Sequence, residues 1–537
     1  MTTAAVAARS QAVAEAPPLS PWLISMVVML ATFMEVLDTS IANVSLPHIA
    51  GSLSASNDES TWVLTSYLVS NAIVLPLSGW FSNLFGRKRF YMTCVVLFTA
   101  SSFLCGLAPT LPLLIFFRVL QGLGGGGLQP SAQAILADAF PPEQRGMGFS
   151  VYAMAVVFAP AIGPTLGGWI TDNFNWRWIF YINVPVGILS FVATGALLKD
   201  PAYLVERVKQ LRGKLRIDYV GMGLLTIGLG FLQVVLDKGQ EDDGFGSSLT
   251  AWSSTISAVA LLGLLWWELR ADNPIVDLRL FRERNFAVSN LLIFALGFSL
   301  LGSTVLLSQF LQTLMGYSAT ECGKVLSPAG ILVMMILPIT GMLINRVGPR
   351  PLITFGLIIG GTALWLTGSI NLQVDYWTVT IYRMMVGVGI AFLFVPISTA
   401  SFSRLPPEKS NAASALFNLA CNLGASFGIA AVTTLTVRQT QVHTNRLVSH
   451  VAAGSSAYKQ VIADLTQRLT LAGASSYEAG RQALALAAKT VEQQAASLAY
   501  LDAFRFLAIA CFTMVPLVWL IKKVPLGKGP VHKRSQG

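Results

Sequence analysis

The chain has few charged residues for its length and many apolar ones. Charged side chains make up only 12% of the 537 residues and hydrophobic side chains 54%, whereas a soluble domain carries about 25% charged residues. Uncharged stretches of about 20 residues, the length at which a helix crosses roughly 30 Å of hydrocarbon, recur along nearly the whole chain. This composition excludes a single aqueous globule and predicts an integral membrane protein.

Residues that build metal, disulfide and catalytic sites are also scarce. The five cysteines are scattered without a CxxC pair, and the four histidines form no cluster with them, so neither a metal centre nor structural disulfides are expected. Residues 122–127 satisfy GxGxxG, but they lie inside an apolar stretch with no preceding strand, which argues against a dinucleotide site. The sequence lacks a Walker lysine motif, a nucleophile elbow and a soluble catalytic domain. We therefore expect no enzyme activity, no ATP hydrolysis and no cofactor, with a proton gradient as the energy source.

The sequence does contain fourteen apolar stretches separated by charged residues or by Pro and Gly. They predict an all-α integral membrane fold. Two thirds of the 36 Lys and Arg residues fall in the tails and in the loops on one side, while the short loops on the other side hold only Arg177, Lys238 and Lys324. Cytoplasmic loops are enriched in Lys and Arg, so both termini are predicted to be cytoplasmic. The net charge of +10 thus follows from topology and gives no support for nucleic-acid binding.

The expected domain organisation follows from these stretches. A disordered cytoplasmic tail at 1–20 precedes an N-terminal six-helix bundle at 21–200, and a linker at 201–285 contributes two additional helices. A C-terminal six-helix bundle at 286–521 carries a long periplasmic insertion at 436–502 and is followed by a basic cytoplasmic tail at 522–537.

Two motifs repeat at nearly the same displacement. Gly86 and Gly348 each precede basic residues after an apolar turn and lie 262 residues apart, and Arg118 and Arg383 lie inside spans 265 residues apart. A shared displacement of this size indicates an internal structural repeat, as expected for two related bundles.

Three further motifs point to one family. They are Leu37, Asp38, Ile41, Asn43, Val44, Leu46 and Pro47 in the first span, Gly163, Pro164, Gly167 and Gly168 in the fifth, and the stretch 175–185 at the start of the sixth. With the Gly-rich basic loop after span two, they resemble the fourteen-span drug:proton antiporter branch (EmrB and QacA type) of the major facilitator superfamily. Two positions depart from the family pattern, because Asn83 replaces an acidic residue of the basic loop and Met154 replaces a glycine of span five. The resemblance implies a bacterial inner-membrane exporter.

Two carboxylates and one arginine should carry proton coupling. A charged side chain in the hydrocarbon core is expensive, so it persists when it is paired, protonated or functional. Glu35 and Asp38 are spaced i,i+3 and share one helical face, where two crowded carboxylates cannot both ionise easily. Arg118 stays charged and should bias them toward proton release. The alternative is a hydrogen-bonded packing pair, with Arg118 tied to backbone carbonyls; Asp38, on which the family motif falls, is the first choice for coupling, and Glu35 could instead meet cationic drugs.

Glycines, prolines and charges near the loops are candidates for conformational roles. Gly163, Gly167 and Gly168 allow close helix approach, and Pro160 and Pro164 permit bending. An Arg87–Asp138 bridge would latch one state. A solvated Asp138 and a purely structural Arg383 are the alternatives. The predicted set is Gly79, Gly86, Arg87, Asp138, Pro160, Gly163, Pro164, Gly167, Gly168 and Arg383.

Polar and aromatic residues near mid-membrane are candidates for substrate binding, because lipophilic cargo requires an apolar site with a few polar groups. Each could instead be a packed residue or one that hydrogen-bonds between helices. The predicted set is Trp62 and Tyr67 on the second span, Gln309 and Gln312 on the ninth, and Asn418 and Asn422 on the thirteenth.

The insertion at 436–502 is too long for an ordinary connection. Ser475 and Glu478 read as a capping box that starts a helix from about 476 to 521, of which roughly half would project from the membrane. The resemblance implies that it docks a periplasmic adaptor leading to an outer-membrane channel; the alternative is an insertion that shields the outer gate.

These observations predict a proton-coupled antiporter that exports small lipophilic or amphipathic compounds, a multidrug efflux pump working by alternating access. The alternatives are a proton-coupled importer or a transporter of one substrate, such as a siderophore or metabolite, on the same fold.

Overall fold

The computed structural model describes residues 20–141, 144–200, 204–206, 218–239, 247–271, 274–450 and 456–522. Apart from Ser20 and Lys522, the predicted tails at 1–20 and 522–537 lie outside the described residues, as does most of 201–217. The described residues are almost entirely helical and contain no strand, in agreement with the all-α prediction.

The described residues of the N-terminal bundle form eight helical segments. They are α2 (Pro21–Ser52), α3 (Asn57–Phe85), α4 (Arg87–Leu107), α5 (Leu111–Gly125), α6 (Leu128–Ala139), α7 (Arg145–Asn173), α8 (Trp178–Tyr181) and α9 (Asn183–Leu197). Helices α5 and α6 form one span that is interrupted at two glycines. A Cβ atom on Gly124 would lie 2.6 Å from the backbone nitrogen of Phe98 in α4, so this glycine run lets α5 pack closely against its neighbours.

Two linker helices lead to the C-terminal half, where short 3-10 or π turns join some of the spans. The linker helices are α11 (Tyr219–Lys238) and α12 (Ser248–Glu268), followed by α13 (Arg284–Gln309), α14 (Ala319–Val347), α15 (Pro349–Thr367), α16 (Tyr376–Phe402), α17 (Ser410–His450), α18 (Ser456–Leu471) and α19 (Ser476–Val518). The turns are η2 (Leu278–Arg282), η3 (Phe310–Leu314) and η4 (Pro407–Lys409).

Thirteen helices of the described chain are long and apolar enough to cross a membrane, and a bent pair makes up to fourteen. The bent pair is α7, whose parts Arg145–Pro160 and Ile162–Asn173 meet at 43°. Pro160 and Pro164 lie inside this helix and remove backbone donors, which accounts for the bend. The predicted number of spans agrees with this count.

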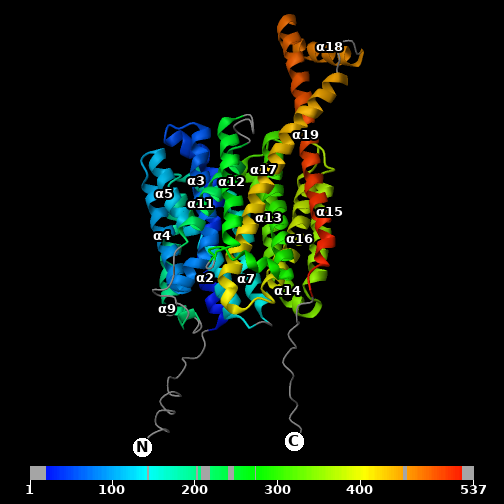
Figure 1. Cartoon of the computed structure of the whole chain (residues 1–537). Helices are drawn as coiled ribbons and strands as arrows, with labels where there is room; N and C mark the ends of the chain where they lie inside the picture. Colours follow the sequence, from blue (N-terminus) through cyan, green and yellow to red (C-terminus); the bar gives the residue numbers. More distant parts are fainter. Residues whose placement is uncertain are drawn as a thin grey trace, which may run out of the picture.

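The spans stand side by side, and the described chain begins and ends at the same end of the bundle (Figure 1). We call this end the tail side and the opposite end the hairpin side. On the hairpin side, α17 and α19 extend beyond the other helices and α18 connects them (Figure 1). The Ser475 hydroxyl accepts a hydrogen bond from the backbone nitrogen of Glu478, so the predicted cap starts α19. The extension of α17 to His450 and the helix α18 were not predicted.

The two halves pack against each other mainly through α7 with α14 and α3 with α17. Helices α11 and α12 pack together, and α11 also contacts both α3 and α17. At that seam, the Gln233 side chain of α11 donates a hydrogen bond to the Ser426 hydroxyl of α17 at 3.1 Å. The additional helix pair therefore lies where the halves meet.

Candidate functional site

The first cluster is a buried ion pair between α2 and α5. The Arg118 Nη1 atom lies 2.6 Å from Asp38 Oδ2, and the two residues are only 0% and 2% exposed. The second carboxylate oxygen, Oδ1, accepts hydrogen bonds from the side-chain amides of Gln121 at 2.9 Å and Asn183 at 2.7 Å. Both oxygens of Asp38 are therefore satisfied, and its charge is matched by a guanidinium.

Arg118 is held on several sides. Its Nε donates to the carbonyl oxygen of Val63 at 2.9 Å, its Nη1 also donates to Gln121 Oε1 at 2.8 Å, and its guanidinium carbon lies 4.4 Å from the ring centroid of Tyr67. Its Nη2 has no hydrogen-bond partner among the described residues. Removing one partner of such a buried pair is costly because the other charge is left uncompensated.

Glu35 lies one helical turn from Asp38 but has different partners. Its Oε1 accepts hydrogen bonds from the Tyr67 hydroxyl at 3.1 Å and from the Asn71 amide at 3.3 Å, and its Oε2 accepts one from the Gln129 amide at 2.7 Å. The side chain is 3% exposed. None of these described partners is charged, so Glu35 can take up a proton without leaving an unpaired cation behind. The two predicted carboxylates thus share a region but not a chemical environment.

A chain of hydrogen bonds leads from Glu35 into the C-terminal half. Gln129 of α6 accepts a hydrogen bond from the Tyr152 hydroxyl of α7 at 3.4 Å, and that hydroxyl also lies 3.1 Å from Asn418 Oδ1 of α17. The Asn418 amide in turn donates to Gln133 Oε1 of α6 at 2.7 Å. We call Glu35, Gln129, Tyr152 and Asn418 the interhalf relay.

A second ion pair lies on the tail side, where α4 begins and α6 ends. Arg87 Nη1 lies 2.7 Å from Asp138 Oδ2 and donates to the carbonyl oxygen of Ala134 at 3.0 Å. The structure therefore brings together the two residues of the predicted latch. Asn83 does not leave a gap where the family has an acidic residue, because its Oδ1 accepts a hydrogen bond at 2.9 Å from Asn411 of α17.

Some glycines near these contacts are required by the backbone conformation or by close packing, and one is not. Gly86, at the end of α3, has φ +88°, a backbone conformation that favours glycine. A Cβ atom on Gly79 would lie 3.0 Å from the Cα of Ala412, and one on Gly167 would lie 3.0 Å from the Ile41 side chain. A Cβ atom on Gly168 would meet nothing within 4 Å, so close packing in this structure does not require glycine there.

Gly163 and Pro160 contact α2 at the bend of α7. A Cβ atom on Gly163 would clash with the side chain of Ser40, whose hydroxyl donates to the carbonyl oxygen of Pro160 at 3.4 Å. A proline at 164 removes the donor that would have bonded to that carbonyl, so the Ser40 hydroxyl takes its place. The bend is thereby tied to the helix that carries Glu35 and Asp38.

The predicted substrate residues do not all converge. Tyr67 and Asn418 join the polar network described above. Trp62 lies near the start of α3 with Lys238 Nζ 5.9 Å from its ring centroid, and Gln312 is exposed in the π turn η3. Gln309 and Asn422 are partly buried and lie outside the described hydrogen bonds of the network.

Sequence reasoning missed several polar partners. Gln121 follows Arg118 by three positions and therefore shares its helical face, and Asn183 lies inside the motif 175–185, so both carried a usable signal. Gln129 and Tyr152 carried none, because single polar residues in apolar helices give no indication of what they face.

Known proteins resemble this chain in sequence and in fold. A family model described as Major Facilitator Superfamily matches residues 28–429. The chain is 39% identical over 430 residues, 80% of this chain and 83% of the relative, to the multidrug export protein EmrB of Haemophilus influenzae. It is 35% identical over 509 residues, 95% of this chain and 96% of the relative, to the probable multidrug resistance protein EmrY of Escherichia coli. The crystal structure of the human organic anion transporter MFSD10 superimposes with a TM-score of 0.60 at 14% identity, covering 94% of this chain and all of that one, a likeness of fold.

Proposed function

The chain belongs to the Major Facilitator Superfamily of membrane transporters, and from this we propose that it exports small lipophilic or amphipathic compounds in exchange for protons. The relatives named for multidrug export and resistance support this function. In this proposal the protein needs no cofactor, because the proton gradient supplies the energy.

The observation that carries the proposal is the difference between the two carboxylates of α2. Asp38 is ion-paired at 2.6 Å, whereas the described partners of Glu35 are neutral. A carboxylate that binds and releases a proton must exist in both forms, and neutral hydroxyl and amide groups tolerate both. We propose that Glu35 exchanges the transported proton and that Asp38 receives it when its pair with Arg118 opens.

The interhalf relay supplies a means of coupling. Alternating access rocks one half against the other, and separating α7 from α17 would break the Tyr152–Asn418 contact. That separation would free the Tyr152 hydroxyl and loosen Gln129, a donor to Glu35. Protonation of Glu35 would then be linked to the opening of the tail side.

We propose a bacterial inner membrane as the location, with the tail side in the cytoplasm and the helical hairpin of α17, α18 and α19 in the periplasm. The excess of Lys and Arg in the tail-side loops supports this orientation. The hairpin exposes apolar side chains to solvent, among them Val461, Leu471 and Leu484 at 53%, 82% and 50%. Exposed apolar residues favour a protein partner, and we propose a periplasmic adaptor that leads to an outer-membrane channel.

The test is transport in everted membrane vesicles under an imposed pH gradient. Wild-type protein should accumulate the neutral lipophilic dye N-phenylnaphthylamine when the lumen is acidic, and Glu35→Gln should lose the dependence on the gradient while remaining folded. Glu492→Gln, a neutralised carboxylate on the exposed part of α19, is the matched control and should transport normally. Gradient-driven uptake by Glu35→Gln at the wild-type rate would remove Glu35 from the proposal, and flux in the opposite direction would indicate an importer.

A further inference from the structure

The internal repeat places an arginine inside a span in each half. Among the described residues, a carboxylate is paired with that arginine only in the N-terminal half. The displacement of 265 residues that relates Arg118 to Arg383 also relates Asp38 to Ser303. The structure bears out this correspondence, because Arg383 Nη1 donates to the Ser303 hydroxyl at 3.2 Å, as Arg118 Nη1 donates to Asp38. A hydroxyl therefore stands where the N-terminal half has a carboxylate.

The residues around Arg383 are also less polar than those around Arg118. At the same displacement, Glu35 corresponds to Leu300 and Gln121 to Val386. Arg383 Nη2 donates to the Thr304 hydroxyl at 2.7 Å, and its Nε has no hydrogen-bond partner among the described residues. No described carboxylate forms an ion pair with it. An arginine remains charged under all relevant conditions, so this site contains an uncompensated positive charge.

Arg383 lines a cavity between the two halves. Val157 and Pro160 of α7 form one wall, Leu326 and Val333 of α14 another, and Thr304 lies beside Arg383. Among the described residues that line it, Arg383 is the one charged side chain. A cavity with apolar walls and one fixed charge fits a molecule with one charged end and an apolar body.

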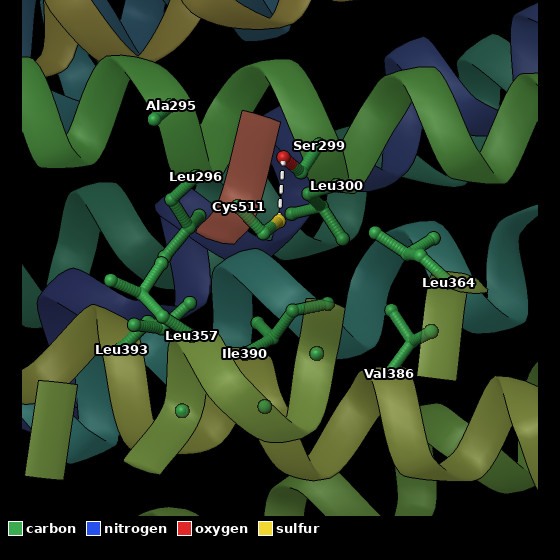
Figure 2. Close-up of a pocket in the computed structure, with 13 residues that line it drawn as sticks. Ala295, Leu296, Ser299, Leu300, Leu357, Leu364, Val386, Ile390, Leu393 and Cys511 are labelled. Carbon is green, nitrogen blue, oxygen red and sulfur yellow. Dashed lines mark hydrogen bonds between the residues drawn. The ribbon is translucent and has the colours of Figure 1, made fainter. Parts of the chain in front are cut away.

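A second cavity lies within the C-terminal half, on the other side of two residues that also line the first. These two residues are Leu300 and Ile390. Figure 2 shows them with the leucines of α13, α15 and α16, and with Cys511 beside Ser299 and Leu300. Apart from the Ser299 hydroxyl, which lies 3.3 Å from the Cys511 sulfur, its labelled lining is apolar. Gly360 of α15 also lines it, and a Cβ atom there would meet only the Cα of Gly389, at 3.9 Å.

We propose that Arg383 anchors the carboxylate of an amphipathic anion whose apolar chain extends past Leu300 and Ile390 toward Cys511. A carboxylate would complete the pair that Ser303 leaves unmade, and a guanidinium binds two carboxylate oxygens in a fixed geometry. A cation would be repelled, and a neutral molecule would leave the charge uncompensated. This substrate class, lipophilic carboxylates, rests on the proposed export function and places substrate in the half that does not contain Glu35 and Asp38.

Binding can be measured apart from transport. Tritiated decanoate is the probe, used in a scintillation proximity assay on full-length protein in nanodiscs, with unlabelled decanoate, decanol and decylammonium as competitors. Decanoate should displace the probe at least about ten-fold better than the other two, and Arg383→Gln should weaken binding by about ten-fold or more, the value of one or two charge-assisted hydrogen bonds. Arg383→Lys should keep part of the affinity. Equal displacement by decylammonium, or unchanged affinity in Arg383→Gln, would overturn the assignment.

Ser303→Asp provides a second test that leaves the arginine in place. It recreates in the C-terminal half the pair formed by Asp38 and Arg118, so it should retain the fold and lose decanoate binding by the same factor as Arg383→Gln. Ser369→Asp adds the same charge at an exposed position after α15, outside both cavities; it serves as the control and should bind decanoate as the wild type does. Wild-type affinity in Ser303→Asp would show that the charge of Arg383 does not hold the ligand.

The chain-binding part is tested by filling the second cavity. Gly360→Val should weaken decanoate by about ten-fold and leave the shorter hexanoate unchanged, since the added methyl groups occupy space that only the longer chain reaches. Loss of both ligands equally, in a variant of unchanged thermal stability, would contradict the direction given for the chain.

The binding assay and the vesicle assay separate the two proposals. Saturable decanoate binding without proton-driven flux would retain the site and reject the exporter. Proton-driven accumulation of N-phenylnaphthylamine in vesicles without saturable decanoate binding would retain the exporter and reject the anion site.

Discussion

The buried pair of Asp38 and Arg118 predicts that its two members respond differently to neutralisation. In Asp38→Asn, the Arg118 guanidinium stays charged, since arginine does not release its proton in proteins. One carboxylate oxygen of residue 38 becomes an amide nitrogen, a donor that faces the donors of its neighbours. In Arg118→Gln, the remaining carboxylate can escape its unfavourable burial by taking up a proton. The first variant should therefore be destabilised at every pH, and the second mainly at high pH.

The magnitudes follow from the burial of the pair. Breaking a buried ion pair costs about 3–5 kcal/mol, and both residues are nearly fully buried with a separation of 2.6 Å. Each unit by which the pH falls lowers the free energy of protonating a carboxylate by about 1.4 kcal/mol. Between pH 7.5 and 5.5, Arg118→Gln should therefore regain up to about 2.7 kcal/mol relative to wild type, whereas the deficit of Asp38→Asn should change by less than about 0.5 kcal/mol.

The measurement is the free energy of unfolding in mixed micelles titrated with dodecyl sulfate, followed by circular dichroism at both pH values. The control is Lys409→Gln, which breaks a pair with Asp277 whose N–O distance is 3.0 Å but whose side chains are 44% and 22% exposed. That loss should stay below about 1 kcal/mol at either pH. The reasoning fails if Asp38→Asn recovers on acidification as strongly as Arg118→Gln does, or if neither variant is less stable than the control.

Three further predictions concern packing, the latch and the hairpin. Gly428→Ala should lower the thermal midpoint because its methyl group would clash with the backbone of α13, whereas Gly480→Ala, where nothing lies within 4 Å, should leave it unchanged or raise it; equal midpoints would refute the packing argument. Asp138→Asn should weaken the contact with Arg87 and raise the labelling rate of cysteines introduced on the tail side, with an unchanged rate counting against a latch. Ser475→Ala should cost about 1 kcal/mol of local stability, seen as faster hydrogen exchange in the first turn of α19 and not elsewhere.

The spans and their motifs were predictable from the sequence because the bilayer imposes long apolar helices and leaves few positions for charge. The same scarcity singled out Glu35, Asp38 and Arg118, since every intramembrane charge needs an explanation. The partners Arg87 and Asp138 were found by topology, as both lie where helices end on the tail side. Their roles in transport stay predictions.

What the sequence could not supply was the identity of neutral partners across helices. Tyr152 and Asn418 are 266 residues apart, and nothing in the local pattern of either indicates the other. The helix α18 was not predictable for a different reason: it faces solvent and lacks the long apolar stretch that marks a membrane span. Residue type predicts that Trp62 and Gln312 lie with Tyr67, but their positions near helix ends keep them out of the network.

The two halves share one scaffold and differ in where the negative charge comes from. In the N-terminal half Arg118 is paired with Asp38 of the chain itself, which leaves Glu35, a turn away, to exchange protons while that pair is closed. In the C-terminal half Ser303 leaves Arg383 to be paired by whatever enters the cavity. If cargo supplies that anion, loading the C-terminal half and protonating the N-terminal half are both charge-neutralising events on opposite sides of the Tyr152–Asn418 contact. Each would lower the free-energy cost of moving the halves through a low-dielectric membrane. The halves would therefore reorient most easily when either Glu35 is protonated or Arg383 is paired with cargo. Exchange of a proton for cargo requires reorientation in these two states.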